Sequence, residues 1–155
     1  MAPPFPAVVF DLDGTLTQPG TTRPAPGVVA LVETLHARGV PLALATSAGT
    51  ATARRVLDEL GLLGCFGSVA GRGSDGLLAG KDAVVGEALL GLGIPHAAPG
   101  SLLVGDGPAD VEAALAHGLV PVGVAWGGSS ADALRAAGAT TVLEHPDELW
   151  AIRAS

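Results

Sequence analysis

The sequence predicts an α/β fold, a Rossmann-like three-layer sandwich built around a mostly parallel sheet of five strands. Short apolar runs alternate with longer segments of helical periodicity, which is the pattern of βαβ units. The first apolar run is nearly free of polar residues, as expected for a strand that is covered on both faces. Strands are expected at 7–11, 41–45, 66–70, 101–104 and 120–125.

Helices are expected between these strands, because apolar residues recur there every three to four positions. In the first helix, at 26–38, the apolar residues share one face and Gly39 ends the segment. Gly86 weakens the helical pattern of its segment, because glycine is a poor helix former. The further helices are expected to end near residue 60 and to lie at 81–92, 109–117, 131–137 and 146–152.

Composition narrows the classes of function. The 155 residues, 48% hydrophobic and 15% charged, suit one buried core, so we expect a single domain over residues 1–155. A net charge of −7 and an aromatic content of 3% argue against a nucleic-acid-binding surface. Cys65 is the only cysteine, and neither a signal-peptide pattern nor an apolar run of about 18 residues is present. These features predict a cytoplasmic protein without a membrane partner.

Acidic and hydroxyl side chains follow three of the predicted strands. They are Asp11 and Asp13, Thr46 and Ser47, and Asp106 with Asp110. Open parallel sheets bind ligands at the carboxyl ends of their strands, so we expect these groups to converge at one edge. A single aspartate after a strand is more often a helix cap or a turn former. Their repetition after several strands is what favours a shared site.

Four segments carry a resemblance to a known family. The segment 8–16, an apolar run that ends in Asp-x-Asp-Gly-Thr-Leu, resembles the first signature of the haloacid dehalogenase superfamily in its phosphatase branch. Segment 44–47 resembles the second signature, Lys81 the third and segment 104–110 the fourth. The tail resembles phosphoglycolate-phosphatase-like members at 123–127 and 145–149. One departure is Asp82, which stands where the family commonly has proline.

The resemblance implies a Mg²⁺-dependent phosphomonoester hydrolase that works through an aspartyl-phosphate intermediate. Asp11 would be the nucleophile, and Asp13 would act as general acid and then as general base. A second aspartate at this position favours a phosphatase over a dehalogenase. Thr46, Ser47 and Lys81 would bind the phosphoryl group, with the start of the following helix contributing N–H donors.

The resemblance also implies the ligands of the metal ion. Asp11 and Asp106 would bind Mg²⁺ through their carboxylates, and Asp13 through its backbone carbonyl. Asp110 would support this site through a water molecule or a hydrogen bond.

Many relatives insert a cap domain, for which this sequence has no room. Only 17–25 separates the first signature from the next predicted helix, and 68–81 is also short. The open site implies a phosphorylated small molecule or macromolecule that covers the site itself, or a neighbouring subunit in a homo-oligomer. The sequence does not name the substrate.

Three other functions stay open at this point. A phosphoacceptor signalling domain would place its accepting aspartate after the third strand, where 69–71 reads Val-Ala-Gly. A catalytically silent binding protein is disfavoured, because every expected catalytic position holds a competent residue. A phosphotransferase or phosphomutase would share the phospho-enzyme.

Overall fold

A six-stranded parallel sheet forms the centre of the computed structural model, which describes residues 3–72, 80–94, 96 and 98–152. The strand order is β3-β2-β1-β4-β5-β6. The strands are β1 Val8–Phe10, β2 Leu42–Gly49, β3 Ser68–Arg72, β4 Leu102–Gly105, β5 Val120–Val124 and β6 Thr141–Leu143. The predicted α/β class and parallel sheet are confirmed, but the predicted number of five strands is wrong. The additional strand β6 has three residues of which only Leu143 is buried, so it lacks an apolar run.

The helices connect these strands and differ from the prediction mainly at their ends. They are α1 Val28–Ala37, α2 Thr50–Glu59, α3 Lys81–Gly91, α4 Pro108–Ala116 and α5 Ala131–Ala137, with 3₁₀ turns at η1 Leu63–Cys65 and η2 Pro146–Ala151. Helix α1 begins after Gly27, whose φ of 84° lies in the left-handed region, and not at Pro26 as expected. The final segment, predicted as a helix, is the tighter 3₁₀ form.

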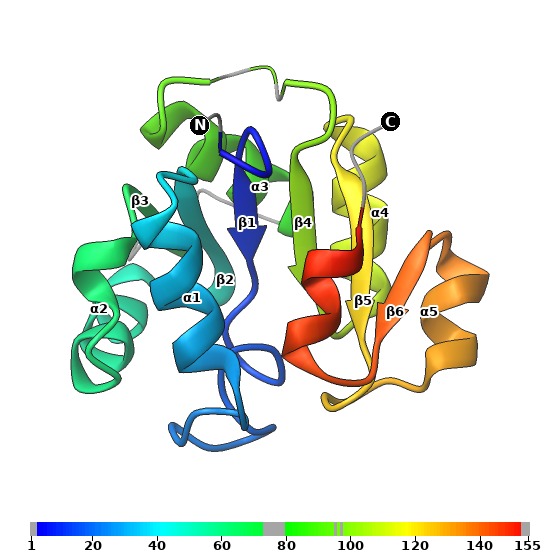
Figure 1. Cartoon of the computed structure of the whole chain (residues 1–155), viewed down its shortest axis with the longest axis horizontal. Coiled ribbons are helices and arrows are strands. Elements are labelled where there is room, and N and C mark those ends of the chain that lie inside the picture. The colour runs from blue at the N-terminus through cyan, green and yellow to red at the C-terminus, as the bar shows by residue number, and fades with distance from the viewer. Residues whose placement is uncertain (1–2, 73–79, 95, 97, 153–155) are drawn as a thin grey trace.

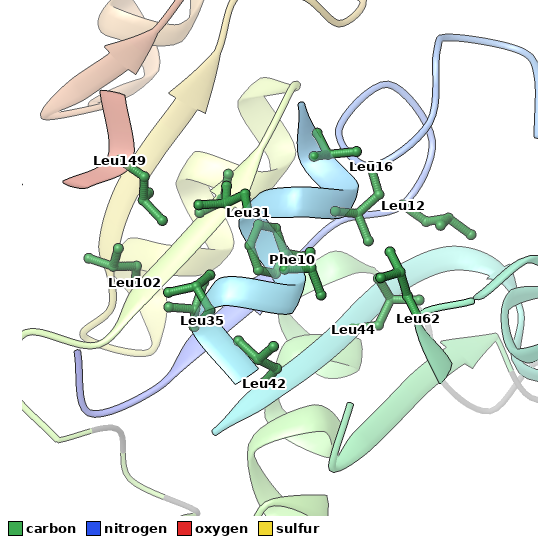
Figure 2. Close-up of a cluster of buried hydrophobic side chains, with 14 of the residues drawn as sticks. Phe10, Leu12, Leu16, Leu31, Leu35, Leu42, Leu44, Leu62, Leu102 and Leu149 are labelled. Carbon is green, nitrogen blue, oxygen red and sulfur yellow. The ribbon is translucent and has the colours of Figure 1, made fainter. Parts of the chain in front are cut away.

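Successive side chains of the central strands enter two different cores. Val8 and Phe10 of β1 belong to the core under α1, α2 and η2, whereas Val9 belongs to the core under α3 and α4. The period of two is that of a strand buried on both faces. Figure 2 shows the first of these cores, with Phe10 surrounded by leucines of the neighbouring strands and of α1. The predicted three-layer sandwich is thereby confirmed (Figure 1).

The topology brings the polar side chains to one edge of the sheet. The chain winds from β1 outward through β2 and β3, and then returns to place β4 on the other side of β1. The carboxyl ends of β1 and β4 are therefore neighbours, at the lower edge of the sheet in Figure 1. The Asp11 N–H donates to the Val104 oxygen at 3.0 Å, which extends this pairing into the loops. A crevice at such a reversal point is where open α/β sheets bind ligands.

No helix among the described residues is long and apolar enough to cross a lipid bilayer.

Candidate active site

The ammonium group of Lys81 lies at the centre of the site. Its Nζ atom donates to Asp11 Oδ1 at 2.8 Å and to the Ala45 oxygen at 2.6 Å, and lies 2.9 Å from Asp110 Oδ1. Only 8% of the lysine side chain is exposed. Burial by itself would lower the pKa of Lys81, but the charges of Asp11 and Asp110 outweigh burial and raise it. The lysine therefore stays protonated and joins β1, β2 and α4 at one point.

Three carboxylates gather beside this lysine. Asp11, Asp106 and Asp110 each offer one oxygen, and these oxygens lie within 4.8 Å of one another. Burial, together with the negative charge of Asp110, raises the pKa of Asp11 to about 8, although Lys81 opposes the shift. The single positive charge of Lys81 thus does not neutralise the negative charge of this carboxylate cluster. Several carboxylate oxygens in excess of the local positive charge fit a hard divalent cation such as Mg²⁺.

Asp106 is held by glycines of two loops. The Gly128 N–H donates to Asp106 Oδ2 at 2.9 Å. A Cβ atom at Gly127 would collide with Asp106 and with the Gly14 oxygen, and one at Gly14 would collide with the Asp106 carboxylate. Gly14 also has a φ of 78°, which side-chain-bearing residues rarely adopt. The backbone can approach the carboxylate this closely only because these positions lack side chains.

Asp13 lies apart from the three carboxylates, on the exposed side of the same loop. Its Oδ1 accepts a hydrogen bond from the Gly20 N–H at 2.9 Å. Gly20 belongs to a short loop in which Thr17 pairs with Pro24. The carboxyl group of Asp13 is thus supported at the open edge of the site.

The second predicted signature is only partly brought to the site. Thr46 is buried, and its Oγ1 accepts from the Ala48 N–H at 3.2 Å, whereas Ser47 is exposed. Residues 46–49, expected as a turn, are instead the end of strand β2, which continues to Gly49, while α2 begins at Thr50 as expected. The start of the helix is therefore separated from Thr46 by a stretch of extended chain.

Sequence reasoning missed the contacts that come from loops and backbone. The Ala45 oxygen carries no side-chain signal, yet it is one of three acceptors around Lys81. The loop after β5 reaches back to the first signature, because Trp126 Nε1 donates to the Thr15 oxygen at 2.9 Å. The adjacent glycines after Trp126 were a sequence signal for a close backbone approach. That Asp106 is the partner of Gly128 could be seen only from the fold.

The chain belongs to the haloacid dehalogenase-like hydrolase family, whose model matches residues 18–118. This confirms the resemblance seen in the sequence. The chain is 39% identical over 121 residues to a phosphoglycolate phosphatase of Rhodospirillum rubrum, which covers 77% of this chain and 48% of that protein. It is also 39% identical over 120 residues to the tyrosine-protein kinase PtkA of Mycobacterium tuberculosis, which covers 77% of this chain and 40% of that protein. The chain spans less than half the length of these relatives.

Solved structures resemble this fold over most of the chain. One is a predicted phosphatase from Clostridium acetobutylicum, at 31% identity and a TM-score of 0.77, over 83% of this chain and 59% of that one. Another, a putative phosphatase from Clostridium difficile, has a TM-score of 0.83 over 94% of this chain and 96% of that one. At 20% identity the second likeness shows the fold alone.

Proposed function

We propose that this chain is a capless, Mg²⁺-dependent phosphomonoester hydrolase domain in which Asp11 is the nucleophile. The observation that carries the proposal is the contact of Lys81 with both Asp11 and Asp110, directly beside Asp106. A buried lysine among carboxylates at the carboxyl ends of β1 and β4 is suited to a phosphoryl group, whose negative charge must be offset while a carboxylate approaches it.

The proposed reaction has two displacements at phosphorus. A carboxylate oxygen of Asp11 forms a bond to phosphorus while the bond to the leaving oxygen breaks, and Asp13 gives that oxygen a proton. Water then attacks the phosphorus of the aspartyl-phosphate, Asp13 accepts its proton, and inorganic phosphate leaves as Asp11 is regenerated. Asp13 suits this role because it lies at the exposed edge, where a leaving group and water both have access.

Asp11 and Asp106 would hold Mg²⁺ through their carboxylates, with the backbone carbonyl of Asp13 as a further ligand. When bound, the ion would supply positive charge to the phosphoryl oxygens and lower the pKa of Asp11. Asp110 would act through its contacts with the Lys81 ammonium and with the Gly107 N–H, which lies 3.1 Å from Asp110 Oδ2. Thr46 and Ser47 would receive phosphoryl oxygens at the end of the buried part of β2.

Transfer to another acceptor is the second candidate, and the likeness to a tyrosine-protein kinase favours it. The same phospho-enzyme would then be attacked by a hydroxyl group in place of water. The chain contains no tyrosine, so it cannot serve as its own tyrosine substrate. A tyrosine kinase reaction would require an acceptor outside these 155 residues.

An aryl phosphate assay tests the hydrolase and its rival together. Wild type, Asp11→Asn and the exposed control Asp58→Asn are compared with and without Mg²⁺, while phenol and inorganic phosphate are both measured. We expect Mg²⁺-dependent turnover that Asp11→Asn abolishes and Asp58→Asn retains, with equal amounts of the two products. Phenol in excess of phosphate when a tyrosine peptide or alcohol is added would favour transfer. Turnover that survives Asp11→Asn in a pure preparation would contradict the mechanism.

We also propose that residues 1–155 act as one catalytic core domain and that the protein works in the cytoplasm. We further propose that the open site is covered by the substrate or by a second copy of the chain. Between Leu16 and Val28 the chain forms only the short loop with its Thr17–Pro24 pairing. Of the second place for a cap, at 68–81, residues 73–79 lie outside the described residues. Light scattering at micromolar concentration that detects a monomer alone would leave substrate coverage as the explanation.

A further inference from the structure

His117, the residue after the end of α4, is joined to the beginning of α3. Its Nε2 lies 2.7 Å from the backbone oxygen of Asp82. A carbonyl oxygen can only accept, so Nε2 carries the hydrogen and donates it. Asp82 follows Lys81 in the first turn of α3. The imidazole therefore attaches the turn that carries the lysine to the helix that carries Asp110.

Gly86 provides the space for this imidazole. A Cβ atom at Gly86 would lie 3.2 Å from His117 Cε1 and 3.7 Å from its Nε2. The first distance is shorter than ordinary van der Waals contact, so a larger residue would press on the ring. The glycine that weakens the helical pattern of α3 thus has a packing role, because the absence of a side chain there leaves room for the ring beside the helix backbone.

Helix α4 faces the first turn of α3 with small side chains along most of its length. A crevice of about 230 Å³ lies between α3 and α4. It is lined by Lys81, Asp82, Ala109, Glu112, Ala113 and Ala116. Because alanines form much of its wall, polar contacts help to fix the distance between the first turn of α3 and helix α4. One such contact is Lys81 with Asp110, and the other is His117 with the Asp82 oxygen.

We propose that His117 is a positioning residue, which holds the first turn of α3 so that the Lys81 ammonium lies between Asp11 and Asp110. The value of this placement for phosphoryl transfer rests on the proposed function. The placement itself does not, since it can be measured on the lysine without any substrate.

Lys81 is the only lysine of the chain, which makes its amine an isolated probe. Reductive methylation of the folded full chain, followed by peptide mass mapping, separates Lys81 from the N-terminal amine. In wild type the reaction should be slow, because the side chain is 8% exposed and each ammonium hydrogen has an acceptor. We expect His117→Ala to accelerate methylation about fivefold, the effect of losing one typical hydrogen bond.

Two further variants separate positioning from simple stabilisation. His117→Gln keeps an N–H donor at similar reach and should return the rate to within about twofold of wild type. His36→Ala, at the end of α1, is the matched control and should leave the rate unchanged. A folded His117→Ala variant that is methylated at the wild-type rate would overturn the proposal. This holds even if the melting temperature of the variant falls, because a lower melting temperature alone shows only lost stability. A fast His117→Gln would overturn it as well.

Activity on an aryl phosphate gives an independent readout. We expect kcat/KM of His117→Ala to fall about fivefold, in line with the methylation rate. If wild type hydrolyses no phosphate ester, the proposed function fails while the methylation series still decides the role of His117. If activity follows the hydrolase prediction but the methylation rates of wild type and His117→Ala agree, the role of His117 fails alone.

Discussion

The stability of the metal-free protein should depend on pH in a direction opposite to that of an ordinary buried ion pair. Burial and the charge of Asp110 raise the pKa of Asp11 from 3.8 to about 8, against the effect of Lys81. In the unfolded chain the same carboxyl group ionises near its ordinary pKa of about 3.9. Between these two values the folded state holds a proton that the unfolded state has released.

The sign follows from proton linkage. Where the folded state binds more protons, the free energy of unfolding falls as the pH rises, by at most 1.36 kcal/mol per pH unit for one group. From pH 5 to pH 8 the Asp11 contribution amounts to about 4 kcal/mol, a large part of the 5–15 kcal/mol that is typical of a folded domain. Asp11→Asn cannot ionise, so it should gain stability relative to wild type over this range.

Urea unfolding followed by tryptophan fluorescence measures the effect at several pH values in the presence of a chelator. The quantity of interest is the difference in unfolding free energy between wild type and Asp11→Asn, because titrating groups that do not interact with Asp11 cancel in it. The exposed variant Asp58→Asn is the control and should follow wild type. Mg²⁺ should stabilise wild type more at pH 8 than at pH 5, since the ion favours ionised Asp11. A wild-type-minus-variant difference that is constant within about 0.5 kcal/mol would refute the raised pKa.

Three further substitutions test separate parts of the site. Lys81→Met should cost about 3 kcal/mol of stability near neutral pH in urea unfolding, because it leaves the buried Asp110 carboxylate without its cation. Gly127→Ala should weaken Mg²⁺ binding about tenfold in calorimetry and destabilise the fold by about 1–3 kcal/mol, because its Cβ would displace Asp106. Gly128→Ala is its control, since a Cβ there would lie at 3.4 Å from Asp106 Oδ2, and equal effects of the two variants would contradict this reasoning. Asp13→Asn should slow steady-state hydrolysis about 10²–10⁴-fold without loss of stability, and a near-normal rate would remove it as the general acid.

The buried strands and their order along the chain could be predicted because their residues are apolar on both faces. Val8, Val9 and Phe10 have no polar neighbour within the strand, so the run itself indicates coverage from both sides. Strand β6 escaped prediction because an edge strand of three residues is specified by pairing with β5 and not by an apolar run of its own.

The contacts of the site are likewise of two kinds. Some are made by side chains and can be predicted from the sequence, whereas others are made by backbone groups and cannot. Asp11, Asp106 and Asp110 lie together, as the convergence of strand ends led us to expect. Lys81, which only the family resemblance indicated, contacts Asp11 and Asp110. The Ala45 oxygen and the Gly128 N–H have no side-chain identity, so their roles follow only from how β2 and the loop after β5 are folded. The roles of the predicted site residues in catalysis remain predictions.

The short loop after β1 has a consequence for the order of events during turnover. Its ends are joined by the Gln18 N–H to the Arg23 oxygen at 2.9 Å, and its Gly20 N–H holds Asp13 at the same distance. If Asp13 is the proton donor, as we propose, its carboxyl group is already held in place before a phosphate ester arrives, and this loop need not rearrange to position it. Discrimination between substrates would then depend on contacts at the exposed edge of the site and not on whether a substrate fits inside a closed cavity.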